Sequence, residues 1–388
     1  MNRRNIPISL PVTGEEEWLA VKEPLMNGWL TAGPKVREFE QLFAERHRVK
    51  HAIAVTSATT ALHLAVIALD VKAGDEVIVP AFTWVSTANV VLYQGAKVVF
   101  VDVDPITFNL DLKDLRKRIT KRTKAIIPVH LFGLCADMDQ IKELANGIPL
   151  IEDGACAAGS GYKGVPAGGL GTIGCFSFHP RKSVTTGEGG MVTTNDDRLA
   201  EIIKSLRNHG ASISEEERHY GPKPYILPAF NLMGYNYRMT DLQGAVGVVQ
   251  IKKLDKLINE RDQWASFYKK ELASIPWLQL PTFGKEYQHG WQSFVTMVDE
   301  EKAPAKRNEI MKKLQQLGIS TRPGTHAVHM LDFYKDKFGL EADDFPGARD
   351  ANNFSMAIPL HNRMVEEDYY YVVEALRSEE HTSELQSL

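Results

Sequence analysis

Lys182 is the first residue whose position suggests chemistry, and it lies in the stretch GCFSFHPRKSVTTGEGGMVTTN, residues 174–195. A lysine amine is mostly protonated in water, but a suitable environment lets it form a Schiff base and act as a base. Gly187, Gly189 and Gly190 follow, and glycine lets a backbone turn sharply and approach another group closely. The alternative is a solvated surface lysine, which is the ordinary place for this residue type.

A second feature lies where the run before Ser57 gives way to the helical pattern TTALHLAVIAL, residues 59–69. Ala58 and Thr59 would then present backbone N–H groups and a hydroxyl at a helix start, which suits a phosphate. Ser57 could instead be an ordinary helix N-cap with no ligand.

Two more candidates follow predicted strands. Asp153 ends the apolar run IPLIED, residues 148–153, and Trp84 follows IVPAF and opens a predicted helix. An acid at a strand end could be a plain turn residue, and an aromatic ring there could belong to the core.

The elements that must position these residues alternate between strand and helix patterns. Six short apolar runs rich in β-branched residues predict strands buried on both faces: 75–80, 96–103, 124–131, 148–153, 173–178 and 189–194. Helical patterns lie between them: 59–69, 83–94, 111–119, 137–145 and 196–209. This order predicts an α/β fold of three layers, α/β/α, with a mostly parallel central sheet. Ligands of such sheets bind at the carboxyl ends of the strands, where all four candidate features lie.

Together the residue types match the needs of pyridoxal phosphate. This cofactor requires a lysine amine, an acid against its pyridine nitrogen, a phosphate-binding turn and a ring that stacks on it. Lys182, Asp153, Thr59 and Trp84 supply these groups in turn.

The second half of the chain predicts a smaller C-terminal α+β domain. A helical pattern over 240–272 could bridge two domains, and it is followed by the segments 292–299, 307–318 and 366–377. We predict a large domain over 1–255 that includes an N-terminal arm, and a small domain over 256–377. The polar, Pro-rich segment 212–228 predicts a long loop. The tail 378–388 is uninterpretable as structure and is predicted to be foreign sequence.

Composition excludes several classes of protein. The chain has 388 residues and a net charge of −4, and no basic stripe indicates nucleic acid. No apolar run is long enough for a membrane helix, and the start is a poor signal peptide. The three cysteines are far apart in sequence, so neither a metal site nor a disulfide framework is expected, and a reducing cytoplasm fits.

One motif is a false lead. GSGYKG, residues 159–164, matches the dinucleotide-binding pattern G-x-G-x-x-G. That site requires a helix directly after the glycines, but Pro166, Gly168 and Gly169 prevent one. A tight loop is the better interpretation.

The chain resembles the DegT-type, StrS-like sugar-nucleotide aminotransferases, which are pyridoxal-phosphate enzymes of the aspartate aminotransferase fold. The resemblance extends over nearly the whole chain. The segments that carry it are GWLTAGPKVREFE, SATTALHLA, VPAFTWVSTANVV, VHLFGLCADMD, IEDGA, FSFHPRKSVTTGEGGMVTTND, GYNYRMTDLQGAVG and RPGTHAVHM.

The resemblance implies a role for each matching residue. Lys182 would bind the cofactor covalently and move protons, Asp153 would pair with the pyridine nitrogen, and Trp84 would stack on the ring. The cofactor phosphate would be held by Ala58, Thr59 and Ser177. Asn236 would reach the phosphate of the neighbouring subunit, so the active unit would be a homodimer.

Other matching residues are less defined. His326 and His329 match a loop that lines the sugar pocket in relatives, although surface histidines remain the alternative. Cys156 stands where relatives often have Gln, His or Glu near the cofactor's phenolic oxygen, and a thiol is a weaker hydrogen-bonding group. His130 has no assigned role. Arg238 could be structural or could bind substrate, and Arg181 is unexplained.

The function implied is transfer of an amino group from L-glutamate to a keto group of a nucleotide-linked deoxy sugar. A cyclitol or another cyclic ketone is the alternative acceptor. Sugar dehydratases of the same family have histidine in place of the lysine, so Lys182 argues against that branch. A non-catalytic protein that retains the fold is disfavoured because Lys182, Asp153 and Trp84 are all present.

Overall fold

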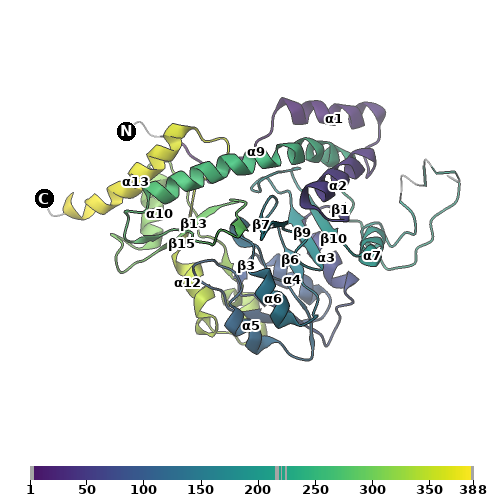
Figure 1. The fold of residues 1–388 in the computed structure, drawn as a ribbon, viewed down its shortest axis with the longest axis horizontal. Coiled ribbons are helices and arrows are strands. Elements are labelled where there is room, and N and C mark those ends of the chain that lie inside the picture. Colours follow the sequence, from purple (N-terminus) through teal and green to yellow (C-terminus); the bar gives the residue numbers. More distant parts are fainter. Residues whose placement is uncertain (1–3, 215–217, 220, 223–224, 386–388) are drawn as a thin grey trace.

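Seven strands among the described residues form the central sheet (Figure 1). The computed structural model describes residues 4–214, 218–219, 221–222 and 225–385. A four-stranded part and a three-stranded part are joined by bridges from Ile126 to Leu150 and from Val129 to Asp153. The strand order is therefore β1 (His51–Val55), β10 (Gly190–Thr194), β9 (Ile173–Ser177), β6 (Ile151–Asp153), β5 (Thr123–Ile126), β2 (Glu76–Pro80) and β4 (Lys97–Val101).

The sheet is mostly parallel, as predicted. Strand β10 runs antiparallel to both of its neighbours, β1 and β9, whereas the remaining pairs run parallel. Gly190, at the start of β10, therefore lies opposite Val55 and Ser177, which end their strands. The connection from β9 to β10 consequently begins and ends at the carboxyl edge of the sheet.

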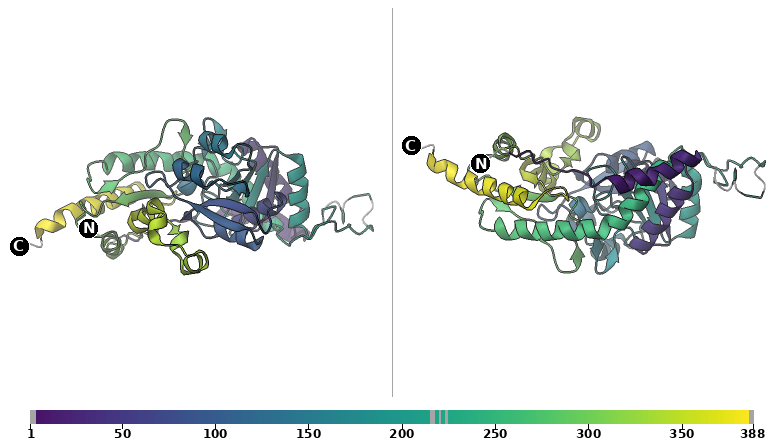
Figure 2. Two further views of the ribbon diagram at one scale, coloured as in Figure 1. Left: turned by 90° about the horizontal axis from the view of Figure 1, so that it is seen from below. Right: turned by 90° about the horizontal axis from the view of Figure 1, so that it is seen from above.

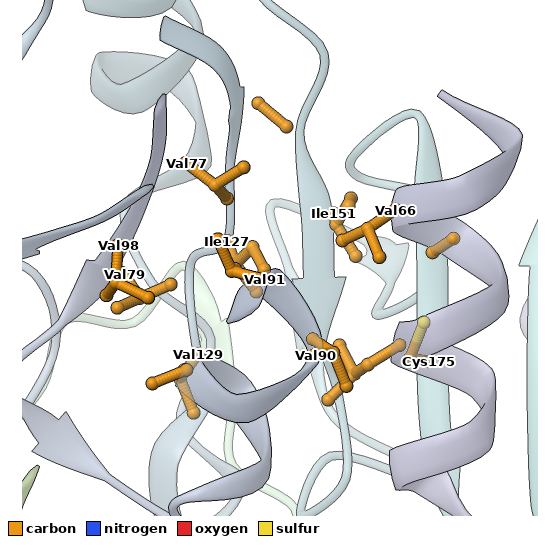
Figure 3. Packing of buried hydrophobic residues seen from close by; sticks show 14 of the residues in the cluster. Val66, Val77, Val79, Val90, Val91, Val98, Ile127, Val129, Ile151 and Cys175 are labelled. Carbon is orange, nitrogen blue, oxygen red and sulfur yellow. The ribbon is translucent and has the colours of Figure 1, made fainter. Parts of the chain in front are cut away.

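Alternating side chains divide the core into two layers on opposite faces of the sheet. Ile53, Val55, Val77 and Val79 pack with α3 (Ala58–Ala68), α4 (Ser86–Tyr93) and α7 (Asp197–Arg207). Figure 3 shows Val66 of α3 and Val90 and Val91 of α4 among sheet residues of this cluster.

The other face carries Ala52, Ala54 and Ile78. They pack with α2 (Pro34–His47), α5 (Leu112–Arg118), α6 (Met138–Ala145) and α9 (Asp241–Glu271). Helices thus cover both faces of the sheet, which confirms the three-layer prediction.

Capping residues explain where several helices begin. The side chains of Ser57, Asp137, Asp196 and Thr240 each accept a hydrogen bond from a backbone N–H of the first turn. Helix α4 begins at Ser86, three residues later than the pattern predicts. The reason is that β3 (Phe82–Thr83) pairs with β14 (His326–Ala327), so Trp84 precedes the helix instead of opening it.

The C-terminal part forms a second core around β11 (Leu278–Gln279), β13 (Phe294–Val298) and β15 (Ser355–Ile358). Helices α10 (Arg307–Gln316) and α13 (Glu366–Leu385) pack on it. Helix α9 reaches from α1 (Glu15–Asn27) and α2 to α13, as Figure 2 also shows. The predicted α+β unit and the bridging helix are both present.

Two segments cross the predicted domain boundary, which itself remains a proposal. Ile6 of the N-terminal arm pairs with Ile319 and packs in the C-terminal core. The segment with α11 (Asp332–Phe338) and α12 (Pro346–Phe354) packs against the large core, where Gly347 N–H donates to Asp102 Oδ2 at 2.9 Å. The two cores therefore exchange segments, and the division at 255/256 stays a prediction.

The remaining predictions concern loops and the tail. GSGYKG contains β7 (Gly161–Tyr162), which forms a hairpin with β8 (Val165–Pro166), so the tight-loop interpretation is confirmed. Helix α13 continues to Leu385, and residues 386–388 lie outside the described part. The origin of 378–388 stays a prediction. Within the described ranges, no helix combines the length and apolar character needed to cross a membrane.

Candidate active site

The candidate residues collect at the carboxyl edge of the sheet. Ala58 and Thr59 follow β1, Asp153 ends β6, and Ser177 ends β9. Lys182 lies in the connection between β9 and β10. The elements therefore place these residues where the strand pattern predicts.

Lys182 is held by a folded connection and not by a free loop. Its backbone N–H donates to the carbonyl of His179 at 2.9 Å, and Phe178 O accepts from the backbone N–H of Thr186 at 3.0 Å. The half-buried amine lies 3.2 Å from the sulfur of Cys156. This position contradicts the alternative that Lys182 is an ordinary solvated surface lysine.

Two glycines behind Lys182 have a definite structural reason. Gly187 has a φ of +82°, a conformation that L side chains rarely adopt. A Cβ on Gly190 would lie 2.4 Å from the carbonyl carbon and oxygen of Ser57 and 2.8 Å from the nitrogen of Ala58. Strand β10 can pass beneath the Ser57–Thr59 turn only because Gly190 has no side chain.

Asp153 is a buried carboxylate, 4% exposed, with incomplete compensation for its charge. Burial raises its pKa, while the hydroxyl of Thr87 at 2.8 Å, the N–H of Ala155 at 3.2 Å and the charge of Lys182 act in the opposite direction. A buried carboxylate of this kind favours a cationic neighbour. The protonated pyridine nitrogen of pyridoxal phosphate is such a group.

Trp84 presents an apolar ring to solvent, with 59% of the residue exposed. The ring of His326 lies against it, with the centroids 5.5 Å apart and the planes at 69°. The pairing of β14 with β3 holds the two residues together. An exposed indole at the sheet edge fits the predicted stacking on a cofactor ring.

The predicted phosphate site consists of a helix start and nearby hydroxyls. Ser57 Oγ accepts from Thr60 N–H at 3.2 Å and caps α3, so the capping alternative holds for Ser57 itself. Thr59 Oγ1 lies 2.9 Å from Ser86 Oγ, and Ser177 lies at the same edge. Helix N-termini favour anions, so these groups fit a phosphate.

Two residues before α9 differ in their environment. Asn236 is exposed, and its backbone pairs with Asn208. Arg238 Nη1 donates to the side-chain oxygen of Asn208 at 2.8 Å, which supports the structural alternative for Arg238.

His329 does not share the position of His326. Its side chain is fully buried, and its Nε2 lies 3.2 Å from the carbonyl oxygen of Ala342. The structure therefore gives His329 no access to a substrate, because it points into the contact with Phe345. His326 alone of the pair lies beside Trp84.

His130, which had no assigned role, supports the strand that carries Asp153. Its Nδ1 accepts from Ala136 N–H at 3.2 Å, so Nε2 carries the proton that it donates to Glu152 Oε2 at 2.9 Å. Glu152 also accepts from the N–H groups of Gly168 and Gly171. The fully buried carboxylate is thereby satisfied and joins β6 to the segment before β9.

Sequence reasoning missed the hydroxyl chain that holds Asp153. Thr83 Oγ1 lies 3.0 Å from Thr87 Oγ1, which donates to Asp153. The signal was the pattern TWVST, which places two threonines four residues apart beside Trp84. Ser86, which lies beside Thr59, belongs to the same pattern and was also missed.

The residues present fit pyridoxal phosphate. An amine, a buried anion, an exposed aromatic ring and a helix N-terminus lie along one sheet edge, and Gly190 leaves space for the close approach of two backbone segments. Lys182, Asp153, Trp84, Thr59 and Ser177 are therefore the residues that would hold it.

Comparisons with known proteins identify the family of the chain. The model of the DegT/DnrJ/EryC1/StrS aminotransferase family matches residues 11–377. The spore coat polysaccharide biosynthesis protein SpsC of Bacillus subtilis (strain 168) is 39% identical over 382 residues, which cover 97% of this chain and 98% of SpsC.

Solved structures extend the agreement to three dimensions. The putative sugar aminotransferase Spr1654 from Streptococcus pneumoniae, in its PMP form, has a TM-score of 0.90 and 28% identity, and the match covers 97% of this chain and all of the other. Helicobacter pylori PseC, an aminotransferase involved in the biosynthesis of pseudoaminic acid, has a TM-score of 0.90 and 26% identity, covering 97% and 99% of the two chains. The chain is therefore a pyridoxal-phosphate-dependent aminotransferase that belongs to the DegT/DnrJ/EryC1/StrS aminotransferase family.

Proposed function

We propose that this aminotransferase moves the amino group of L-glutamate to a keto group of a nucleotide-linked deoxy sugar. The observation that supports catalysis is the half-buried amine of Lys182 on the same sheet edge as the buried Asp153 and the exposed Trp84. The likeness to PseC and to Spr1654 supports a sugar as the acceptor. His326, beside Trp84, is the proposed wall of the sugar pocket.

Each of these residues has its own role in the two half-reactions of amino transfer. Pyridoxal phosphate, when bound, supplies a carbonyl for the amine and a ring that withdraws electrons from the reacting carbon. Lys182 Nζ removes a proton from the donor carbon and returns protons in the second half-reaction. Asp153, which accepts a hydrogen bond from Thr87, would hold the pyridine nitrogen in its protonated form. Trp84 would exclude water from one face of the cofactor ring.

A homodimer is the proposed active unit, and the connection between α7 and α9 supports it. The described part of this connection projects from the body of the chain (Figure 1) and exposes Tyr225, Leu227, Phe230 and Met233. Exposed apolar groups gathered in one segment indicate a partner surface. The exposed Asn236 follows directly and would reach the phosphate site of the second copy. A reducing cytoplasm is the proposed location, since all three cysteines are unpaired.

The catalytic proposal is tested with Lys182→Ala and a surface control, Lys204→Ala, whose amine pairs with Glu201. We expect Lys182→Ala to lose at least about 1,000-fold in release of 2-oxoglutarate from glutamate, because one residue supplies both the covalent link and the proton transfers. Lys204→Ala should match the wild type. A panel of nucleotide-linked keto sugars and cyclic ketones then identifies the acceptor, and a preference for a cyclitol ketone would replace the nucleotide sugar.

The dimer is tested with Phe230→Asp and Asn236→Ala. A charge at position 230 should shift the sedimentation coefficient to that of a monomer, because burying it without a partner is costly. Asn236→Ala should remain a dimer but bind pyridoxal phosphate more weakly. A wild-type monomer with full activity contradicts the proposal.

A further inference from the structure

The residues on both sides of Lys182 are held by side chains from the C-terminal part of the chain. The side-chain amide of Gln292 donates to the carbonyl oxygen of Arg181 at 3.0 Å. On the other side, Nη1 of Arg261 donates to the hydroxyl oxygen of Ser183 at 3.4 Å. Gln292 and Arg261 are both buried. The neighbours of Lys182 are thus tied to residues that lie 111 and 78 positions away in the sequence.

Arg261, on α9, is a buried cation whose other acceptors are also neutral. Its Nε donates to Asn362 Oδ1 at 2.7 Å, and its Nη1 donates to the carbonyl oxygen of Trp291 at 3.2 Å. Burial lowers its pKa to about 10, so the side chain is still charged at neutral pH. A buried charge without an opposite charge is costly, and packing alone therefore does not explain a guanidinium at this position.

The turn that carries Gln292 is strained. Trp291 has a φ of +46°, a left-handed conformation that is uncommon for a bulky residue. Its N–H donates to His289 Nδ1 at 2.8 Å, its indole Nε1 donates to Asp262 Oδ1 at 2.7 Å, and its carbonyl accepts from Arg261. Such strain persists only where the surroundings over-determine it, and it is typical of functional sites. The conformation of Trp291 fixes the place from which the next residue reaches the connection that carries the lysine.

We propose that Arg261 and Gln292 are positioning residues that keep the amine of Lys182 aligned with the reacting carbon. This inference rests on the proposed role of Lys182 in catalysis. A covalent link to the cofactor fixes the amine only until the amino donor displaces it. From then on, the backbone on either side of Lys182 must align the amine for proton transfer, and a misplacement of about 1 Å can lower the rate about 100-fold.

Gln292→Met is the first test, because it removes the amide donor and keeps the length of the side chain. The holoenzyme is mixed with L-glutamate, and the first half-reaction is followed by the absorbance of the bound cofactor. The rate at saturation should fall about 10-fold, the effect of one lost hydrogen bond. The half-saturating glutamate concentration and the Kd for pyridoxal phosphate should change by less than about threefold, because the amide contacts neither ligand.

Thr296→Val is the matched control for this variant. Thr296 is also buried in the C-terminal core and donates to a backbone carbonyl, that of Met356, at 2.9 Å. Its loss removes the same kind of hydrogen bond without touching the connection that carries the lysine. Thr296→Val should therefore match the wild type in both the rate and the half-saturating concentration.

Hydrogen–deuterium exchange of the full chain without cofactor gives a readout that does not depend on activity. The N–H groups of Lys182 and Thr186 both donate to carbonyl oxygens within the same connection. Gln292→Met should speed exchange of these two amides about 10-fold, because the connection opens more easily. Thr296→Val should leave their exchange unchanged.

Arg261→Lys tests the other side of the lysine. It keeps a charge, but an ammonium lacks the planar fork that reaches several acceptors at once. Arg307→Lys is its control, since Arg307 is also buried and donates to the carbonyl of Ser355 at 2.8 Å. Thermal unfolding should show a loss of stability in both variants, whereas only Arg261→Lys should lower the rate. Ser183→Ala removes the contact without changing the buried arginine and should lower the rate in the same direction.

The outcomes that overturn the inference are distinct. An unchanged rate in both Gln292→Met and Ser183→Ala would show that these contacts do not align the amine. A raised half-saturating concentration at an unchanged rate would assign Gln292 to donor binding. An equal loss of rate in Thr296→Val would assign the effect to a general loss of stability. A Lys182→Ala enzyme with wild-type activity would refute the proposed catalytic role and this inference together, whereas an inactive Lys182→Ala beside an unaffected Gln292→Met would refute this inference alone.

Discussion

We infer that Asp153 is unfavourable for folding of the apoprotein and favourable for binding of the cofactor. Burial raises its pKa, so the native state holds the proton more tightly than the unfolded chain does. Stability of the apoprotein therefore falls as pH rises through the range between the ordinary and the raised pKa, and above that range the ionised carboxylate opposes folding. A cationic pyridine nitrogen would reverse this cost.

We predict that Asp153→Asn leaves the melting temperature of the apoprotein unchanged or raises it. The same change should weaken pyridoxal phosphate binding about 30-fold or more, because the ring nitrogen loses its anion. Thermal unfolding with and without saturating cofactor, together with an absorbance titration, measures both effects.

Thr87→Val is the control for this prediction and should act in the opposite direction. It removes a donor from the buried carboxylate, and we expect a loss of about 1–3 kcal/mol of apoprotein stability. An Asp153→Asn apoprotein that is as unstable as Thr87→Val would mean that the charge is well compensated without the cofactor.

At the scale of elements, the contact between β10 and the Ser57–Thr59 turn decides the shape of the predicted phosphate site. The antiparallel β10 begins where β1 ends, so Gly190 lies against the backbone at the N-terminus of α3. Backbone atoms on both sides cannot move aside as a flexible side chain could. Strand order and a missing Cβ together position the helix start.

We predict that Gly190→Ala lowers the free energy of unfolding by about 1–3 kcal/mol and weakens cofactor binding, since the turn must shift. Gly169→Ala is the matched control, because its Cβ would meet Val49 at an ordinary 3.4 Å. Urea denaturation compares the two variants. Equal urea unfolding midpoints for the two variants would show that the turn shifts without a loss of stability.

At the scale of the whole molecule, two buried histidines couple folding to pH. Burial lowers the pKa of His47 to about 4 and that of His289 to about 3. His47 stacks on Phe43, and His289 stacks on Trp291. The two lie in separate parts of the fold, and the native state leaves both neutral where the unfolded chain would protonate them.

We predict that stability falls as pH drops below the ordinary value of 6.5 towards 4, by up to about 1.4 kcal/mol per pH unit for each histidine. The sign follows because the unfolded state binds more protons in this window. Urea titrations of the holoenzyme at pH 7.5, 6.5, 5.5 and 5.0 measure the slope, and His47→Phe should reduce it. A flat profile above pH 5 would contradict the prediction.

Local patterns in the sequence determined the α/β class, the mostly parallel sheet and the sheet-edge positions of Lys182, Asp153 and Thr59. They did so because strand alternation and helix capping depend on residues close in the chain. The same information could not separate His326 from His329, since the burial of His329 depends on Phe345 and Ala342. The late start of α4 likewise follows from pairing with β14, more than 240 residues away.

Tertiary structure alone decided what surrounds each group. The raised pKa of Asp153 arises from burial that no local pattern encodes, and Thr87 becomes its partner only when α4 packs beside β6. The sequence by itself specified which chemical groups are present and on which edge, whereas the long-range packing of the two cores set their charge, access and neighbours.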